Sequence, residues 1–264
     1  VRRLLLAKRH CNSIALVVPP TTSIILPIDP PAPSVRAFSN MSSQNSNQTR
    51  RTGAAANPLL PTMIVFDLDD CLWSPEMHEL SSKPSIPVRG VLNPHMPSDQ
   101  AVEGIVGLSN RNGETVTLYD GARRALYELT CQQQQQYAGI IIAVASTSLE
   151  PSYSYACLNG IEILPGQTMR DLIQYDQIGR TGKLTSRKTT HFQELHQESG
   201  IAYDEMLFFD DCNWGDHVGD IAKEFGVTGQ RTPHGLQWSE FQQGLETYKQ
   251  IALDDMEMVQ KMVR

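Results

Sequence analysis

The stretch Met63–Asp70, which reads MIVFDLDD, decides the fold of this 264-residue chain. Four apolar residues run directly into a group of acidic ones. An apolar run this short, ended by polar residues, predicts a strand that is buried on both faces, as in a parallel sheet. Residues two apart in an extended segment point the same way, so Asp67 and Asp69 are expected to face one site at the carboxyl end of the strand.

Two further apolar runs follow the same pattern. Ile140–Ala145 runs into Ser146-Thr147-Ser148, and Met206–Phe209 runs into Asp210-Asp211. Amphipathic segments alternate with these runs, which predicts an α/β fold with three buried parallel strands flanked by helices. The helices are expected over Gly121–Leu129, Thr189–Ser199 with Gly200 as its stop, Val218–Phe225, and Trp238–Tyr248, and residues 132–136 are expected to form a loop.

Composition excludes several classes of protein. The chain is 40% hydrophobic and 19% charged, which is typical of a globular protein with a real core. Five cysteines without a CxxC pair argue against a disulfide framework and against a zinc ribbon or finger. Prolines interrupt the most apolar N-terminal segment before it reaches about 18 residues, so no membrane span is expected.

The net charge changes sign near residue 60, from basic before it to acidic after it. Residues 1–60 carry seven basic side chains and one acidic one, while the remainder carries 15 basic and 28 acidic. An acidic body repels a polyanion, so nucleic-acid binding is disfavoured. Residues 1–60 are expected to be a disordered tail, with a composition that also fits a transit peptide, so the expected location is cytoplasmic, or mitochondrial or plastid if the tail is such a peptide. We expect one domain over 61–254 and a C-terminal tail over 255–264.

The acidic residues predict a metal site. Placing Asp67, Asp69 and Asp70 directly after a buried strand is unfavourable unless a cation lies nearby. Ligation by carboxylate oxygens alone favours Mg²⁺. The pair Asp210-Asp211, which follows another strand, could complete this site together with Asp67.

The remaining polar residues fit phosphoryl transfer. Asp67 is the natural nucleophile and Asp69 the natural proton donor. Lys188 could counter both the acidic cluster and a phosphate group, and Ser146 and Thr147 offer hydroxyl and N–H groups to phosphate oxygens. The response-regulator receiver uses similar residues, but there the metal-binding acidic pair precedes the phosphorylated aspartate, whereas here the Asp-x-Asp triplet comes first.

At this point the sequence resembles the haloacid dehalogenase-like (HAD-like) hydrolases, and specifically their magnesium-dependent phosphatase family. The first motif is the segment 64–73, IVFDLDDCLW, in its Asp-Leu-Asp-x-x-Leu-Trp form. The similarity continues at Leu118-Tyr119, Ala145-Ser146-Thr147, Lys188–Phe192, Phe208–Asn213 and Gly244–Tyr248, and so covers about residues 61–250. It implies a Rossmann-like parallel sheet flanked by helices, with only a small cap insertion at about 74–118.

The same resemblance implies roles for the site residues. It makes Asp67 the nucleophile that forms an aspartyl-phosphate, and Asp69 the general acid that later activates water. Mg²⁺ would be held by the Asp67 carboxylate, the Asp69 backbone carbonyl and Asp211, with Asp210 as second choice. Ser146 and Lys188 would hold the phosphate. Two positions depart from the family pattern: Thr147, where Arg is frequent, and Cys71, where Thr or another small residue is usual.

These observations predict a magnesium-dependent phosphomonoesterase. The implied substrates are phosphoproteins, including phosphotyrosine, or sugar phosphates and other small phosphorylated molecules. The alternatives are a catalytically weak binding or scaffold protein and a phosphotransferase. Cys71 and Cys212 are expected to be small packed residues, with oxidation that blocks the site as a sharper hypothesis. Trp73 and Trp214 follow the two acidic motifs and could form walls of the pocket, with core packing as the expected role. Structural or solvated positions are expected for His78, His191 and His196.

Overall fold

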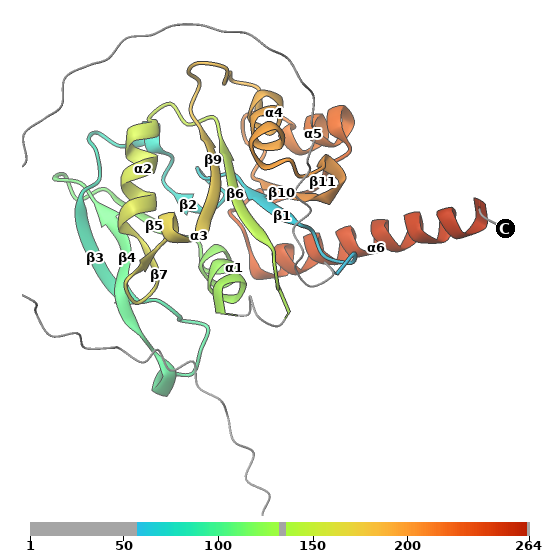
Figure 1. Ribbon diagram of the computed structural model, residues 1–264. Coiled ribbons are helices and arrows are strands. Elements are labelled where there is room, and N and C mark those ends of the chain that lie inside the picture. The colour runs from blue at the N-terminus through green and yellow to red at the C-terminus, as the bar shows by residue number, and fades with distance from the viewer. Residues whose placement is uncertain (1–56, 132–135, 263–264) are drawn as a thin grey trace, which may run out of the picture. The chain divides into compact units, whose positions relative to one another are not determined.

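The computed structural model describes residues 57–131 and 136–262, and a five-stranded sheet lies at their centre (Figure 1). Every strand pair in it is parallel, and the order is β11-β10-β1-β6-β9. The three strands expected from the sequence are its three middle strands, so the predicted parallel α/β sheet is confirmed. The bounds are β1 (Met63–Phe66), β6 (Ile141–Ser146), β9 (Ile173–Ile178), β10 (Met206–Asp210) and β11 (Thr228–Arg231).

Strand β1 is central, and its register positions the polar residues that follow. Its four residues are fully buried. Phe66 is paired with Phe209 on β10 and with Val144 on β6. The Asp67 N–H donates to the Phe209 carbonyl at 2.9 Å, which continues the ladder by one residue. Asp67 therefore leaves the sheet beside the last residue of β10, Asp210.

Helices cover both faces of the sheet, as predicted. Alternate residues of β1 enter different cores: Ile64 and Phe66 belong to one, and Met63 and Val65 to the other. The first core lies under α1 (Asp120–Cys131), α2 (Pro151–Gly160) and α6 (Trp238–Met262), and the second under α4 (Lys188–Ser199) and α5 (His217–Phe225). This period of two is what a strand buried on both faces requires.

A small antiparallel sheet is formed by the segment between β1 and α1 in the sequence, where the insertion was expected. The order of its strands is β2-β5-β4-β3. Arg123 of α1 donates hydrogen bonds to the Val106 carbonyl in this sheet at 2.8 Å and to the Glu162 carbonyl outside it at 3.0 Å. The strands are β2 (Trp73–Ser74), β3 (Ile86–Val91), β4 (Glu103–Ser109) and β5 (Thr115–Leu118), with 3₁₀ helices at Met77–Glu79 and Ser98–Gln100. The remaining elements are β7 (Glu162–Leu164), β8 (Gln167–Thr168), α3 (Met169–Leu172) and a 3₁₀ helix at Tyr203–Glu205.

The last helix corrects the sequence analysis. A tail was expected over 255–264, but α6 continues to Met262 and extends beyond the sheet (Figure 1). Its backbone hydrogen bonds are internal to the helix, so it needs no packing partner to satisfy them. The apolar side chains that this extension leaves exposed are Ile251, Leu253, Met256, Met258, Val259 and Met262.

Some predictions fall outside the described residues. The disordered tail and transit peptide concern residues 1–60, of which 1–56 are not described, and most of the predicted loop at 132–136 is not described either. Within the described ranges, no helix combines the length and the apolar character that crossing a membrane requires.

Candidate active site

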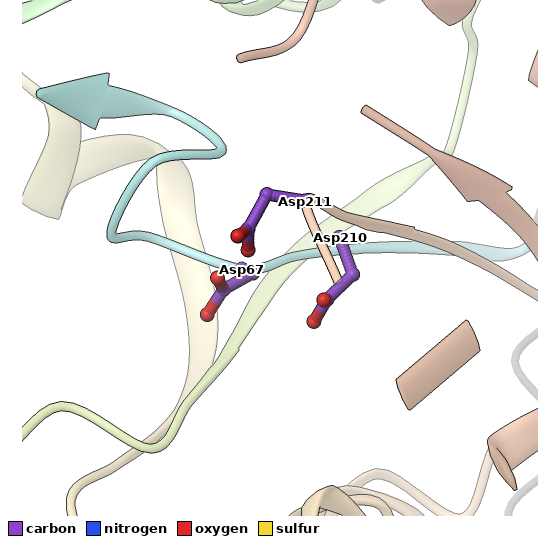
Figure 2. A group of neighbouring side chains, drawn as sticks. All are labelled: Asp67, Asp210 and Asp211. Atoms are coloured by element: carbon purple, nitrogen blue, oxygen red, sulfur yellow. The ribbon is translucent and has the colours of Figure 1, made fainter. Parts of the chain in front are cut away.

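Three aspartates meet where β1 and β10 end (Figure 2). Each of Asp67, Asp210 and Asp211 offers a carboxylate oxygen, and these oxygens lie within 4.8 Å of one another. The side chains are buried, with 5%, 0% and 7% of their residues' surface exposed. The sequence predicted this meeting, because both strands end at the same edge of the sheet.

Lys188 compensates part of this buried negative charge. It is the first residue of α4, is 3% exposed, and places its Nζ 2.6 Å from Asp67 Oδ1. The same ammonium donates to Asp210 Oδ2. Burial lowers the pKa of Lys188, but Asp210 and Asp67 together raise it above its ordinary value. Lys188 is therefore a charged group at the floor of the site.

Both carboxylate oxygens of Asp210 interact with other groups of the protein. Besides Lys188, its carboxylate accepts a hydrogen bond from the Cys212 N–H at 2.8 Å and lies 3.3 Å from His217 Nδ1. Burial would raise the pKa of Asp210, but Lys188 and His217 lower it. Asp210 is thus better suited to holding Lys188 in place than to binding a metal, and its place as second-choice metal ligand stays a prediction.

Asp67 and Asp211 retain the features of metal ligands. Burial raises the pKa of both; Asp210 and Asp211 add to the rise at Asp67, where Lys188 opposes it, and Asp210 adds to the rise at Asp211. A divalent cation would relieve the repulsion between these carboxylates, and oxygen ligands suit Mg²⁺. The predicted Asp69 carbonyl ligand stays a prediction.

Asp69 lies in a different environment from Asp67. Its Oδ1 accepts a hydrogen bond at 2.8 Å from the indole N–H of Trp73, which is fully buried as the sequence analysis expected. Burial raises the pKa of Asp69 to about 6, with the nearby Glu76 carboxylate adding to the rise and the Trp73 bond opposing it. A carboxyl with this pKa can be protonated in a weakly acidic or neutral medium, as a proton donor must be.

One pocket joins all the residues expected to bind phosphate. Ser146, Thr147 and Lys188 line it together with Asp67, Asp69 and Asp211. Its volume is about 200 Å³, below the roughly 300–1,000 Å³ of pockets that enclose drug-sized ligands. It therefore accommodates a phosphate group while leaving most of a larger substrate outside. The pocket is also lined by residues that the sequence did not predict there, namely Glu76, His78, Leu149, Arg180 and His217.

Trp214 lies at the pocket and not in the core. Core packing was its expected role, but the residue is 73% exposed and lines the pocket, which is the alternative that the sequence left open. Its indole N–H donates to Glu76 Oε1 at 2.8 Å, and the ring contacts His78 edge to face at 6.1 Å between centroids. Glu76 and His78 come from the insertion and Trp214 from the loop after β10. The pocket mouth is thus built from both parts of the domain.

The two cysteines near the acidic motifs differ in exposure. Cys71 is fully buried, with its Sγ 3.6 Å from the Phe209 carbonyl and 3.4 Å from Thr232 Oγ1, as expected for a small packed residue. Burial and Asp67 raise the pKa of its thiol. Cys212 is partly exposed, and burial and Asp210 raise its pKa to about 11. Since the thiolate is the reactive form, neither environment favours oxidation.

Comparison with known proteins identifies the family. The model of the family described as Acid Phosphatase matches residues 59–251. The chain belongs to the acid phosphatase family. Among curated proteins, it is 29% identical over 189 residues to human Magnesium-dependent phosphatase 1, covering 72% of this chain and 88% of the relative. It is also 28% identical over 151 residues to a HAD-like hydrolase superfamily protein of Schizosaccharomyces pombe, covering 57% and 76%.

Solved structures give a weaker similarity. A haloacid dehalogenase-like hydrolase of Streptococcus pneumoniae is 13% identical, with a TM-score of 0.40 over 72% of this chain and 91% of that one. A phosphatase-domain structure from Bacteroides fragilis has a TM-score of 0.41 and 17% identity over 66% and 37%. The family match and the curated relatives confirm the resemblance recognised in the sequence. An acid phosphatase family member is a phosphoric monoester hydrolase, so the predicted class of activity is confirmed.

Proposed function

We propose that this acid phosphatase family member hydrolyses phosphomonoesters with Mg²⁺, through an aspartyl-phosphate on Asp67. One observation carries the proposal: the Asp67 carboxylate, at the floor of a phosphate-sized pocket, lies between Lys188, 2.6 Å away, and Asp211. A nucleophile, a cationic group and a metal-binding carboxylate are the parts that phosphoryl transfer requires. The name of the human relative supports magnesium as the cofactor.

The chain's own residues account for each step. Asp67 and Asp211, with the Asp69 carbonyl, would hold the Mg²⁺, which neutralises charge on the phosphate when bound. Ser146 and Lys188 hold the phosphate oxygens. An Asp67 oxygen bonds to phosphorus as the bond from phosphorus to the leaving oxygen breaks, and Asp69 gives that oxygen its proton. Asp69 then takes a proton from water, whose oxygen displaces Asp67 and releases inorganic phosphate.

The pocket mouth supports an aromatic leaving group. Trp214 and Leu149 are 73% and 57% exposed and both line the pocket, so they offer apolar surface just outside the polar floor. Phosphotyrosine, free or in a protein, presents a flat apolar ring directly beside its phosphate. Of the phosphoprotein and sugar-phosphate substrates considered, we propose that aryl phosphates such as phosphotyrosine are preferred.

Release of phosphate from para-nitrophenyl phosphate tests the reaction. We expect turnover that needs Mg²⁺, is lost in EDTA, and falls at least about a thousandfold in Asp67→Asn. Asp99→Asn removes an exposed carboxylate of the insertion and serves as the matched control. Trapping of a phosphorylated Asp67 by rapid acid quench tests the intermediate. A folded protein that binds Mg²⁺ but releases no phosphate would contradict the proposal and favour a binding role.

A further inference from the structure

Arg180 lies at the pocket, and no carboxylate of the described residues compensates its charge. It is exposed, follows β9, and lines the same pocket as Asp67 and Lys188. Other arginines of the α3 to β11 region form ion pairs: Arg170 with Asp176, Arg187 with Glu224, and Arg231 with Asp216. Within residues 57–131 and 136–262, no carboxylate lies within ion-pair distance of Arg180.

The other basic side chains that line the pocket lie against carboxylates of the protein. Lys188 is shared by Asp67 and Asp210. His217 lies against Asp210, and His78 lies 3.0 Å from Glu76. Among the described residues that line the pocket, Arg180 therefore provides a positive charge that no carboxylate compensates and that is available to a second anionic group, beside the phosphate at Lys188.

The backbone beside Arg180 is hydrogen-bonded to Ser146, at the end of β6. The Gly179 N–H donates to the Ser146 carbonyl at 2.8 Å. Buried His191 places its Nε2 3.1 Å from that carbonyl and 3.0 Å from the Gly179 carbonyl, so Nε2 must carry the hydrogen. Gly179 has a φ of +99°, which glycine adopts without strain. Segment 179–180 is thus held at a fixed distance from Ser146.

A hydrogen bond also holds the side chain of Arg180 in place. Its Nε donates to the Thr147 carbonyl at 2.9 Å. This bond fixes the plane of the guanidinium and leaves the Nη1 and Nη2 groups, which can donate to both oxygens of a carboxylate or phosphate. An arginine fixed in this way loses less conformational entropy on binding an anion than a free side chain does.

We propose that Arg180 is a specificity-determining residue that binds a second anionic group on the leaving-group part of the substrate. The inference rests on the proposed phosphatase function. The reacting phosphate occupies the floor with Lys188 and Ser146, whereas Arg180 is exposed and lies by Thr147. A carboxylate on the substrate itself, or an acidic side chain next to a phosphotyrosine in a protein, supplies the same chemistry.

Matched substrates test this assignment. We would compare kcat/KM for phenyl phosphate with that for its meta- and para-carboxylate derivatives, and for phosphotyrosyl peptides with Glu or Gln beside the phosphotyrosine. The wild type should prefer an anionic member by about threefold to tenfold, as expected for a partly exposed charge pair. The arm that shows the preference distinguishes a small carboxylated substrate from an acidic protein.

Variants assign the preference to Arg180. Arg180→Gln should abolish it, mainly through KM, and Arg180→Lys should retain only part because lysine lacks the planar fork. Lys183→Gln removes an exposed charge from the same loop, where it pairs with Glu194, and should leave the preference intact. An equal loss on charged and uncharged esters in Arg180→Gln, or no preference in an active wild type, would overturn the assignment. Absence of turnover by the wild type on every ester would instead contradict the proposed function.

Discussion

The floor and the mouth of the pocket are built on different principles. At the floor, Asp67, Asp210 and Lys188 are almost completely buried, and ion pairs link them. At the mouth, Trp214 and Arg180 are exposed and are held by one hydrogen bond each. Buried charges depend on one another for stability, whereas exposed side chains do not. Changes at the floor should therefore affect folding and reaction together, and changes at the mouth should affect the choice of substrate.

Removing the floor's cation should have the largest effect. Lys188→Met leaves Asp67 and Asp210 without their ammonium partner. Breaking a buried ion pair from one side costs about 3–5 kcal/mol, so the free energy of unfolding in urea should fall by that amount, with turnover of para-nitrophenyl phosphate also lost. Lys183→Met, which removes an exposed lysine, should change the free energy of unfolding by less than about 1 kcal/mol. Equal effects of the two variants would contradict the comparison.

Metal binding should appear as stability before any substrate is added. If Mg²⁺ binds Asp67 and Asp211 in the native state, a concentration of about 100 times its Kd adds about 2.7 kcal/mol to the free energy of unfolding. Thermal unfolding with Mg²⁺ and with EDTA measures this difference. Asp211→Asn should lose it, and Asp99→Asn should retain it. A magnesium effect that survives in Asp211→Asn would move the metal site elsewhere.

His191 connects the ends of β6 and β9 through the Ser146 and Gly179 carbonyls. It should make the free energy of unfolding depend on pH, with a smaller effect than those above. Burial lowers the pKa of His191, so the imidazole stays neutral in the native state at a pH where the unfolded chain, with its pKa of about 6.5, takes up a proton. The stability that His191 provides is complete above that pH. It falls on acidification toward the lowered native pKa, by up to about 1.4 kcal/mol per pH unit.

Urea unfolding of wild type and His191→Asn between pH 8 and pH 5 measures this contribution. The difference in free energy of unfolding between the two should shrink as the pH falls below about 6.5. His234→Asn changes an exposed histidine and serves as the control. A difference independent of pH would show that His191 is not held neutral by burial.

The smallest effect is expected at the mouth. Trp214→Ala should lower the ratio of kcat/KM for phosphotyrosine to that for phosphoserine by about threefold to tenfold, because one exposed aromatic contact is worth about 1 kcal/mol. The free energy of unfolding should hardly change. Glu76→Gln keeps an acceptor for the indole N–H and should preserve the ratio, while Glu76→Ala should reduce it. An unchanged ratio in Trp214→Ala would assign the selectivity to another group.

The same division explains what the sequence could predict. The floor residues follow apolar runs that end in acids or hydroxyls, so Asp67, Asp69, Ser146 and Asp211 could be located from strand pattern alone, and the family motif added their roles. Lys188 begins a helix whose apolar spacing is regular. These signals are local in the chain, and the parallel sheet brings their positions to one edge.

The mouth and the outer elements have no such local signal. Arg180 and His217 reach the pocket only because β9 and α5 pack beside it, and neither stands in a distinctive pattern. Strand β11 reads Thr-Gly-Gln-Arg, which lacks an apolar run, and Trp214 resembles any core aromatic in the sequence. The sequence does not predict the end of α6, because the side chains of its last turns are exposed in the described part of the chain and burial periodicity does not mark them.

Trp73 connects the interior to the reaction. Its ring fills the first core, and its indole N–H fixes the carboxyl of Asp69. Any change in packing that shifts this ring also shifts Asp69, the group that we propose transfers the proton. The temperature dependence of the rate should therefore contain a contribution from local loosening of the core. Substitutions in the core far from the pocket are then expected to slow the enzyme before they unfold it.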